Sequence, residues 1–198
     1  MIGGLLKWAA AVVLGFLLGA GSALLVIGWG AQRSSVAAGA WTINTLAGSQ
    51  SADIYTRAFV ARVGLLALAQ SETIYFQAAQ DADGRPLTEG CRYELAGGPL
   101  PARWWSITLY AADNHLPRNE GDALSIDATS VRADEAGRWT AVVSAASPQD
   151  AENWISSDAA GEGFTLTLRL YNPTDAARND PAQVPTPSLR MLGCGDAT

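Results

Sequence analysis

The chain has 198 residues, a formal net charge of −6 at pH 7 and a sequence pI of about 4.7. Lys7 is the only lysine, and twelve arginines are scattered singly between Arg33 and Arg190. Binding to nucleic acid requires clustered positive charge that displaces counterions from phosphates, so this composition excludes a nucleic-acid-binding protein. The length allows one domain of ordinary size after an apolar N-terminal segment.

That apolar segment, residues 8–29, is long enough to cross a bilayer. It carries no charge and would span roughly 33 Å as a helix, since each residue rises ~1.5 Å. Trp8 and Trp29 lie at its two ends, where membrane interfaces favour aromatic side chains. The pattern predicts a transmembrane helix.

The domain boundaries follow from this helix. We expect residues 1–33 to be an N-terminal tail and the transmembrane helix, residues 34–50 a stalk in which Trp41 and Ile43 can touch the domain, and residues 51–198 a periplasmic β-sandwich domain. The alternative is a cleaved signal peptide with Ala38-Gly39-Ala40 as its cleavage site. Signal peptides have apolar regions of only about 7–15 residues, which favours the uncleaved anchor.

Orientation depends on charge and on the cysteines. Lys7 and the α-amine precede the helix while Arg33 follows it, so the positive-inside rule slightly favours a cytoplasmic N-terminus. Cys91 and Cys194 are the only cysteines and have no metal-binding spacing, which indicates one disulfide in an oxidising compartment. The alternative is two buried free thiols. We expect a single-pass protein of a bacterial inner membrane with its domain in the periplasm.

Four small residues, Ala11, Gly15, Gly19 and Ala23, are spaced by four along the predicted helix. Such a stripe allows helix backbones to approach closely, and it would then indicate a homo-oligomer or a membrane partner. The alternative is the ordinary abundance of glycine and alanine in membrane helices.

A helix is expected after Ser51, opening with Asp53. Apolar residues recur at helical spacing and form one predicted face: Ile54, Ala58, Ala61, Leu65 and Leu68. We expect this amphipathic helix to pack on one face or end of a sheet.

From residue 73 onward the pattern changes to short strands separated by turn residues. The expected strands are residues 73–78, 91–95, 104–110, 124–128, 139–144, 164–171 and 188–192. A long loop, residues 172–187, is expected between the last two strands. Short strands with turn-rich connections favour an antiparallel sandwich over a parallel α/β sheet. The predicted fold class is therefore mainly β, with one transmembrane helix and one amphipathic helix.

Part of the chain resembles a known family. The resemblance lies in residues 101–110, Asn119, Asn153-Trp154 and residues 168–173. These residues resemble the bacterial family called domain of unknown function 1214, and the preceding stretch, from Trp41 through residues 72–76, resembles its short, membrane-anchored branch. The resemblance implies a jelly-roll-like β-sandwich. It also implies a companion, domain of unknown function 1254, and it supplies no catalytic residue.

Residues for catalysis or metal binding are scarce. His115 is the only histidine and lies in a predicted turn, and neither a zinc site nor a Ser-His-Asp triad is indicated. We therefore predict no catalytic residue, no metal and no cofactor. Four carboxylates share one stretch: Asp122, Asp127, Asp134 and Glu135. They are expected to be solvated loop charges, with a glycosidase-type pair as the alternative.

One predicted sheet face has the composition of a binding surface. If the strands 104–110 and 164–171 are neighbours, alternation places aromatic rings, hydroxyls and one arginine on a common face: Trp104, Ser106, Thr108, Tyr110, Arg169 and Tyr171, with Trp154 at its border. Such a face suits a protein partner or a glycan. The alternative is an ordinary outer face, or an Arg169 paired with a carboxylate such as Glu72.

Three functional hypotheses follow. The first is a non-catalytic cell-envelope protein that assembles with a membrane or periplasmic partner, such as the companion domain. The second is a glycan-binding module that uses the aromatic sheet face. The third is an envelope hydrolase that uses carboxylates.

Overall fold

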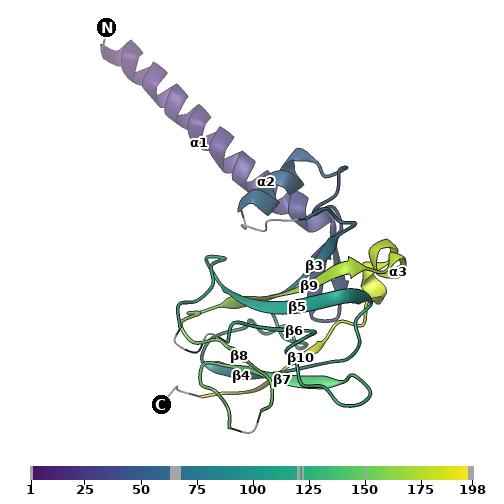
Figure 1. Cartoon of the computed structure of the whole chain (residues 1–198). Coiled ribbons are helices and arrows are strands. Elements are labelled where there is room, and N and C mark those ends of the chain that lie inside the picture. Colours follow the sequence, from purple (N-terminus) through teal and green to yellow (C-terminus); the bar gives the residue numbers. More distant parts are fainter. Residues whose placement is uncertain (1, 63–67, 120, 122, 150, 196–198) are drawn as a thin grey trace.

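Two β-sheets pack face to face, and a long helix projects from one side of them (Figure 1). The structure is a computed structural model that describes residues 2–62, 68–119, 121, 123–149 and 151–195. Helices α1 and α2 lie on the side of the six-stranded sheet, and the four-stranded sheet lies on the opposite side. The fold is mainly β, as the sequence predicts.

Helix α1, Ile2–Arg33, is the projecting helix. Its segment Lys7–Val26 is long and apolar enough to cross a membrane, and none of that segment is buried against the rest of the chain. The large apolar side chains of this segment, from Trp8 to Val26, are exposed.

The six-stranded sheet has the order β1-β2-β3-β9-β5-β6, and all its neighbouring strands are antiparallel. Its strands are β1 Ser35–Ala38, β2 Trp41–Asn44, β3 Thr73–Ala78, β9 Phe164–Pro173, β5 Ala102–Ala111 and β6 Ser125–Asp127.

The four-stranded sheet has the order β10-β4-β7-β8. Its strands are β10 Ser188–Cys194, β4 Cys91–Gly97, β7 Trp139–Ser144 and β8 Trp154–Ser156. The β7–β8 pair is parallel, which differs from the expected all-antiparallel arrangement. Val142, Val143 and Ser144 of β7 lie beside Trp154, Ile155 and Ser156 of β8 in the same order, so the two strands run in the same direction.

The core lies between the two sheets and follows the predicted alternation. Six apolar side chains of β5 and β9 point inward and are buried: Trp105, Ile107, Leu109, Leu166, Leu168 and Leu170. Trp105 stacks on Trp139 of the opposite sheet with ring centroids 5.1 Å apart. Since inward residues alternate with outward ones, the intervening side chains of β5 and β9 form the outer face of the six-stranded sheet.

Residues 34–50 differ from the predicted stalk, because they contain β1 and β2. Trp41 and Ile43 of β2 are buried in the core, and the Trp41 indole donates to the carbonyl oxygen of Pro187 at 2.7 Å. Burying two large apolar side chains stabilises the fold by several kcal/mol, about 1.5–3 for each, which explains why this segment joins the sheet.

A helix is present where the amphipathic helix was predicted, but its predicted apolar face does not pack on the sheet. Helix α2, Ile54–Arg62, begins where the Asp53 carboxylate accepts from the Thr56 amide at 2.7 Å. It lies against α1 and not on the sandwich (Figure 1). Ile54, Ala61 and Leu68 of the predicted face are exposed, and Leu65 lies outside the described residues.

The predicted loop 172–187 contains short helices. Helix α3, Asp175–Asn179, is capped by the Thr174 hydroxyl, and the 3-10 turn η1, Pro181–Gln183, follows it. Ala177 and Val184 pack into the core, which holds this connection on the sandwich.

Candidate functional site

The aromatic face is the outer surface of the six-stranded sheet made by alternate residues of β3, β5 and β9. Strands β5 and β9 are direct neighbours, as the predicted face requires of the strands at residues 104–110 and 164–171. Trp104 lies opposite Tyr171, and Ser106 lies opposite Arg169. The structure therefore brings Trp104, Ser106, Thr108, Tyr110, Arg169 and Tyr171 onto one face, which is the face on the α1 side of the sandwich (Figure 1).

Arg169 occupies the centre of this face between two tyrosine rings. Its guanidinium carbon lies 5.4 Å from the Tyr110 ring centroid and 6.0 Å from that of Tyr75. One guanidinium nitrogen donates to Tyr110 Oη at 2.7 Å. Within the part of the chain that the structure describes, no carboxylate forms an ion pair with Arg169, including Glu72, which was the predicted alternative.

The Arg169 guanidinium therefore keeps N–H groups that can donate hydrogen bonds to another molecule. A guanidinium has five N–H donors, and Tyr110 uses one of them. The flanking tyrosine rings favour the cation through their negative faces. They also hold the planar group in one orientation, so Arg169 is arranged to receive a carboxylate or a phosphate.

Trp104 and Tyr171 form the second part of the aromatic face. Their ring centroids are 5.1 Å apart with an interplanar angle of 57°, and the Trp104 indole donates to the Thr129 hydroxyl at 2.9 Å. Both side chains are half-buried. Two fixed aromatic rings with part of their surface exposed present apolar area that loses little entropy on binding.

Sequence reasoning missed β3 as a contributor to this face. Tyr75 lies opposite Arg169 in the β3–β9 ladder, and its hydroxyl accepts from the Leu68 amide at 2.9 Å. Thr73 and Tyr75 are buried although they belong to the outer face. The period-two alternation of residues 73–78 could have indicated Tyr75, but the order of the strands could not be read from the sequence.

Trp154 is not part of the aromatic face. It belongs to β8 of the four-stranded sheet, and its indole donates to the Ser144 carbonyl at 3.1 Å. Trp154 was predicted to border the aromatic face, but its strand belongs to the other sheet.

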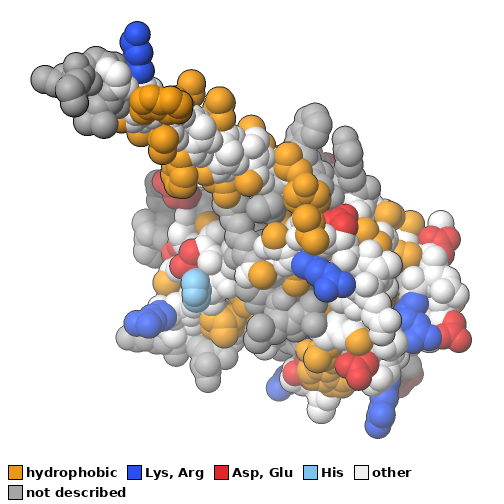
Figure 2. Space-filling view, turned by 90° about the horizontal axis from the view of Figure 1, so that it is seen from above, with side chains coloured by type: hydrophobic (Ala, Val, Ile, Leu, Met, Phe, Trp, Pro, Cys, Tyr) orange, Lys and Arg blue, Asp and Glu red, His pale blue; other side chains and the backbone are white. Residues whose placement is uncertain are grey.

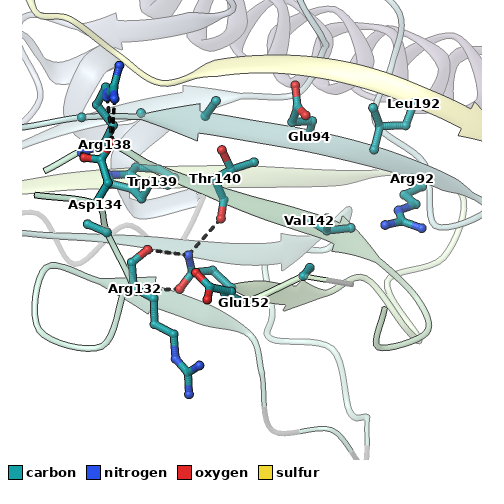
Figure 3. A pocket seen from close by; sticks show the side chains of 16 residues that line it. Arg92, Glu94, Arg132, Asp134, Arg138, Trp139, Thr140, Val142, Glu152 and Leu192 are labelled. Carbon is teal, nitrogen blue, oxygen red and sulfur yellow. Dashed lines mark hydrogen bonds and ion pairs between the residues drawn. The ribbon is translucent and has the colours of Figure 1, made fainter. Parts of the chain in front are cut away.

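A second concave surface, the charged groove, lies on the outer face of the four-stranded sheet (Figure 3). It has a volume of about 1030 Å³. Its charged lining consists of Arg92, Glu94, Arg132, Asp134, Arg138 and Glu152. The Arg138 guanidinium pairs with Asp134 at 2.8 Å, and Glu94 pairs with Arg190 at 3.0 Å. These contacts neutralise two of the three carboxylates that line the groove.

Asn153 holds one wall of the charged groove in place. Its side-chain oxygen accepts from the Arg132 amide at 2.8 Å, and its nitrogen donates to the carbonyls of Arg132 and Thr140 at 2.9 Å each (Figure 3). The side chain is buried with its amide group engaged on both sides. Asn153 therefore has a structural role that joins the loop at Arg132 to β7.

Two of the four carboxylates predicted in the stretch 122–135, Asp127 and Asp134, stabilise turns of the backbone. Burial works to raise the pKa of Asp127, but the amides of Thr129 and Ser130 donate to its carboxylate and hold that pKa below its usual value. The amide and guanidinium of Arg138 lower the pKa of Asp134. A general acid needs a raised pKa, so neither carboxylate is suited to that task. Glu135 is exposed, and Asp122 lies outside the described residues.

The structure also describes the remaining residues singled out in the sequence: the histidine, the cysteines and the small residues of α1. His115 is exposed in a turn, where its amide donates to the Asp113 carboxylate. Among the described residues there is no group of three or more His, Cys, Asp or Glu side chains placed to hold a metal ion. The disulfide between Cys91 and Cys194 is present, as predicted. The stripe of Ala11, Gly15, Gly19 and Ala23 stays a prediction.

The fold and the site together define a class: a two-sheet β-sandwich module that carries an exposed apolar helix on the side of its aromatic face. Residues 72–175, just over half of the chain, match the model of the family described as protein of unknown function DUF1214. The chain belongs to this family, which confirms the resemblance.

One solved structure shows the same fold within a longer chain. The VPA0106 protein from Vibrio parahaemolyticus is 23% identical with a TM-score of 0.57, and the match covers 72% of this chain and 36% of that one. An uncharacterised protein from Burkholderia cenocepacia is 17% identical with a TM-score of 0.46, covering 61% and 29%. The chain thus spans about a third of the length of these proteins. No curated protein matches it.

Proposed function

We propose that this chain is a non-catalytic, membrane-anchored assembly module of the cell envelope that binds a protein partner through its aromatic face. In this proposal α1 crosses the bacterial inner membrane with its N-terminus in the cytoplasm. The sandwich then lies in the periplasm, where the disulfide between Cys91 and Cys194 forms in an oxidising environment.

The observation that carries the proposal is the arrangement around Arg169. A guanidinium held between Tyr75 and Tyr110, without a carboxylate partner among the described residues, has donors available for another molecule. Trp104 and Tyr171 lie beside it on the same sheet face. Arginine, tyrosine and tryptophan are the residues that dominate protein–protein binding energy.

The partner that fits this face offers a carboxylate to Arg169 and an apolar side chain to the rings. A protein carrying domain of unknown function 1254 is our proposed partner, in line with the family resemblance. The match to VPA0106 supports the idea that this fold operates beside further polypeptide, since it makes up 36% of that chain.

In-cell crosslinking followed by purification of the full chain from native membranes tests this proposal. We expect a crosslinked partner with the wild-type chain and at least a tenfold loss with Arg169→Ala, which corresponds to about 1.4 kcal/mol of binding free energy. Arg132→Ala is the matched control, because that arginine is exposed in a loop beside the opposite sheet.

Two results would contradict the proposal. One is recovery of the wild-type chain without any partner. The other is loss of the partner with Arg132→Ala but not with Arg169→Ala, which would move the docking surface to the charged groove.

A glycan-binding module is the second candidate function, favoured by the half-buried rings of Trp104 and Tyr171 beside the hydroxyls of the same face. Sugar rings stack on aromatic side chains and their hydroxyls accept and donate hydrogen bonds. Titration with soluble cell-wall glycan separates the two candidates. Binding that Trp104→Ala abolishes would support the glycan candidate, and no binding by the wild-type chain would remove it.

A further inference from the structure

The segment between β2 and β3 projects from the sandwich toward α1 and is closed at its base. The Gln70 amide donates to the Gly48 carbonyl at 3.1 Å, and its side chain donates to the Thr45 carbonyl at 2.9 Å. Gly48 approaches this base closely, because a Cβ there would lie 2.4 Å from the Leu68 oxygen. These contacts fix the place where the segment that contains α2 leaves the sheet.

Helix α2 exposes apolar side chains that the sandwich does not cover. Ile54 is 74% exposed and Tyr55 is 41% exposed, while the polar Thr56 is the buried side chain of the first turn. An isoleucine left in water forgoes the stabilisation that burial of its side chain would contribute. An apolar surface on a helix that packs beside α1 therefore indicates an apolar environment that the chain itself does not supply.

The position of α2 indicates what that environment is. It lies beside the part of α1 nearest the sheet (Figure 1). Figure 2, viewed from the α1 side, shows hydrophobic side chains along α1 that continue onto the domain around its base. Helix α2 thus packs against α1, whose segment Lys7–Val26 the proposed function places in the bilayer.

The charge of α2 fits the same environment. The sequence of Ile54–Arg62 contains arginines and no acidic residue, although the whole chain has a net charge of −6. Helices that lie in a membrane interface combine apolar and aromatic side chains with basic ones, because phospholipid headgroups carry phosphates. Arg57 is exposed and donates to the carbonyls of Ala52 and Gln50, so it sits at the start of the helix.

We propose that α2 is a second membrane contact, which lies at the boundary between headgroups and acyl chains with Ile54 and Tyr55 inserted into a phospholipid bilayer. The proposal rests on the anchoring role of α1 in the proposed function. Two contacts restrict rotation of the sandwich about the anchor, so the aromatic face keeps a fixed orientation toward the membrane side.

Nitroxide spin labels measure this contact in the full chain reconstituted in vesicles of phosphatidylethanolamine and phosphatidylglycerol. Single labels are introduced through Ile54→Cys, through Leu17→Cys in α1, and through Leu192→Cys in the charged groove. Leu192 is the matched control, because it is an apolar side chain 43% exposed on the opposite sheet. The native cysteines are joined in the disulfide, so the label reacts at the introduced thiol.

The readout is the accessibility of each label to oxygen, which concentrates in the bilayer, relative to a water-soluble nickel chelate. We expect the highest ratio at position 17, an intermediate ratio at position 54 and the lowest at position 192, with a several-fold gap between the last two. Tyr55→Cys provides a second reading of α2 with the same expected result.

The outcomes distinguish the two proposals. A high ratio at position 17 with equal, low ratios at positions 54, 55 and 192 would overturn the α2 contact and leave the anchor intact. A low ratio at position 17 would overturn the anchor and, with it, the contact proposed for α2.

Discussion

Gly97 and Gly98 are neighbouring glycines at the end of β4 with opposite surroundings. A Cβ at Gly97 would lie 2.5 Å from Cζ2 of Trp139, whereas a Cβ at Gly98 would meet nothing within 4 Å. Trp139 is buried and stacked on Trp105 across the core, so its ring has little freedom to move. The absence of a side chain at Gly97 therefore allows the two sheets to close over these tryptophans.

We predict that Gly97→Ala lowers the free energy of unfolding by about 1–3 kcal/mol, because the added methyl group overpacks this contact. Gly98→Ala, the matched control, should change it by no more than roughly 0.5 kcal/mol. Denaturant unfolding followed by tryptophan fluorescence measures both values. Equal effects of the two substitutions would contradict the packing argument.

Asp81 is a buried carboxylate whose ionised form the fold stabilises. Burial works to raise its pKa, but hydrogen bonds from the amides of Arg85 and Asp83 and from the Arg85 guanidinium outweigh burial and lower the pKa from its usual 3.8. A pKa that is lower in the folded state stabilises the fold above the unfolded value, and the contribution is lost as pH falls through the folded pKa.

The melting temperature should therefore fall as the pH is lowered below about 4, since the Asp81 carboxylate takes up a proton at a higher pH in the unfolded chain than in the folded one. Asp81→Asn should melt at a lower temperature at neutral pH and show a weaker pH dependence in this acidic range. Thermal unfolding between pH 2 and 7 is the measurement, with the exposed Glu135→Gln as control. An unchanged acid dependence in Asp81→Asn would show that other carboxylates are responsible.

At the scale of elements, the edge strand β10 is held by both a ladder and a covalent bond. It pairs with β4 from Ser188 to Cys194, and the disulfide joins the paired residues Cys91 and Cys194 at one end of this ladder. The cysteines are 103 residues apart, so the bond closes most of the sandwich into one loop. Such a long loop loses much conformational entropy in the unfolded state when it is closed.

We predict that the double substitution Cys91→Ser and Cys194→Ser lowers the free energy of unfolding by about 4–5 kcal/mol, the value that the chain-entropy model gives for a loop of this length. Denaturant unfolding of the double variant and of the reduced wild-type chain should give the same loss. A double variant as stable as the oxidised wild-type chain would contradict this account.

At the scale of the whole molecule, the sandwich separates two surfaces with different character. The aromatic face and α2 lie on the α1 side, and the charged groove lies on the opposite side (Figure 1). In the groove Asp134 pairs with Arg138, and Glu94 pairs with Arg190, whereas Arg169 on the aromatic face has a tyrosine hydroxyl as its partner. If α1 is the anchor, the aromatic face, where Arg169 keeps N–H donors for another molecule, is turned toward the membrane. A partner should then bind the sandwich on its membrane side.

The sequence by itself determined features that depend on local patterns. Strand-favouring residues bounded by turn residues located β3, β5, β7 and β9. Period-two alternation assigned the inward and outward side chains of β5 and β9, because burial on one face of a sheet imposes that period. The uncharged stretch around residues 8–29 identified α1, and the two lone cysteines gave the disulfide. The aromatic face was predicted in part for the same reason.

Only the tertiary structure decided how distant segments meet. Residues 34–50 carry no strong strand signal, yet Trp41 and Ile43 are buried because β3 offers them an edge to pair with. The helical spacing of Ile54 and Ala58 suggested packing on the sheet, but the chain directs α2 to α1. The order of the strands places Tyr75 beside Arg169 and places Trp154 in the other sheet. This order depends on how both sheets pack together, which no local sequence pattern encodes.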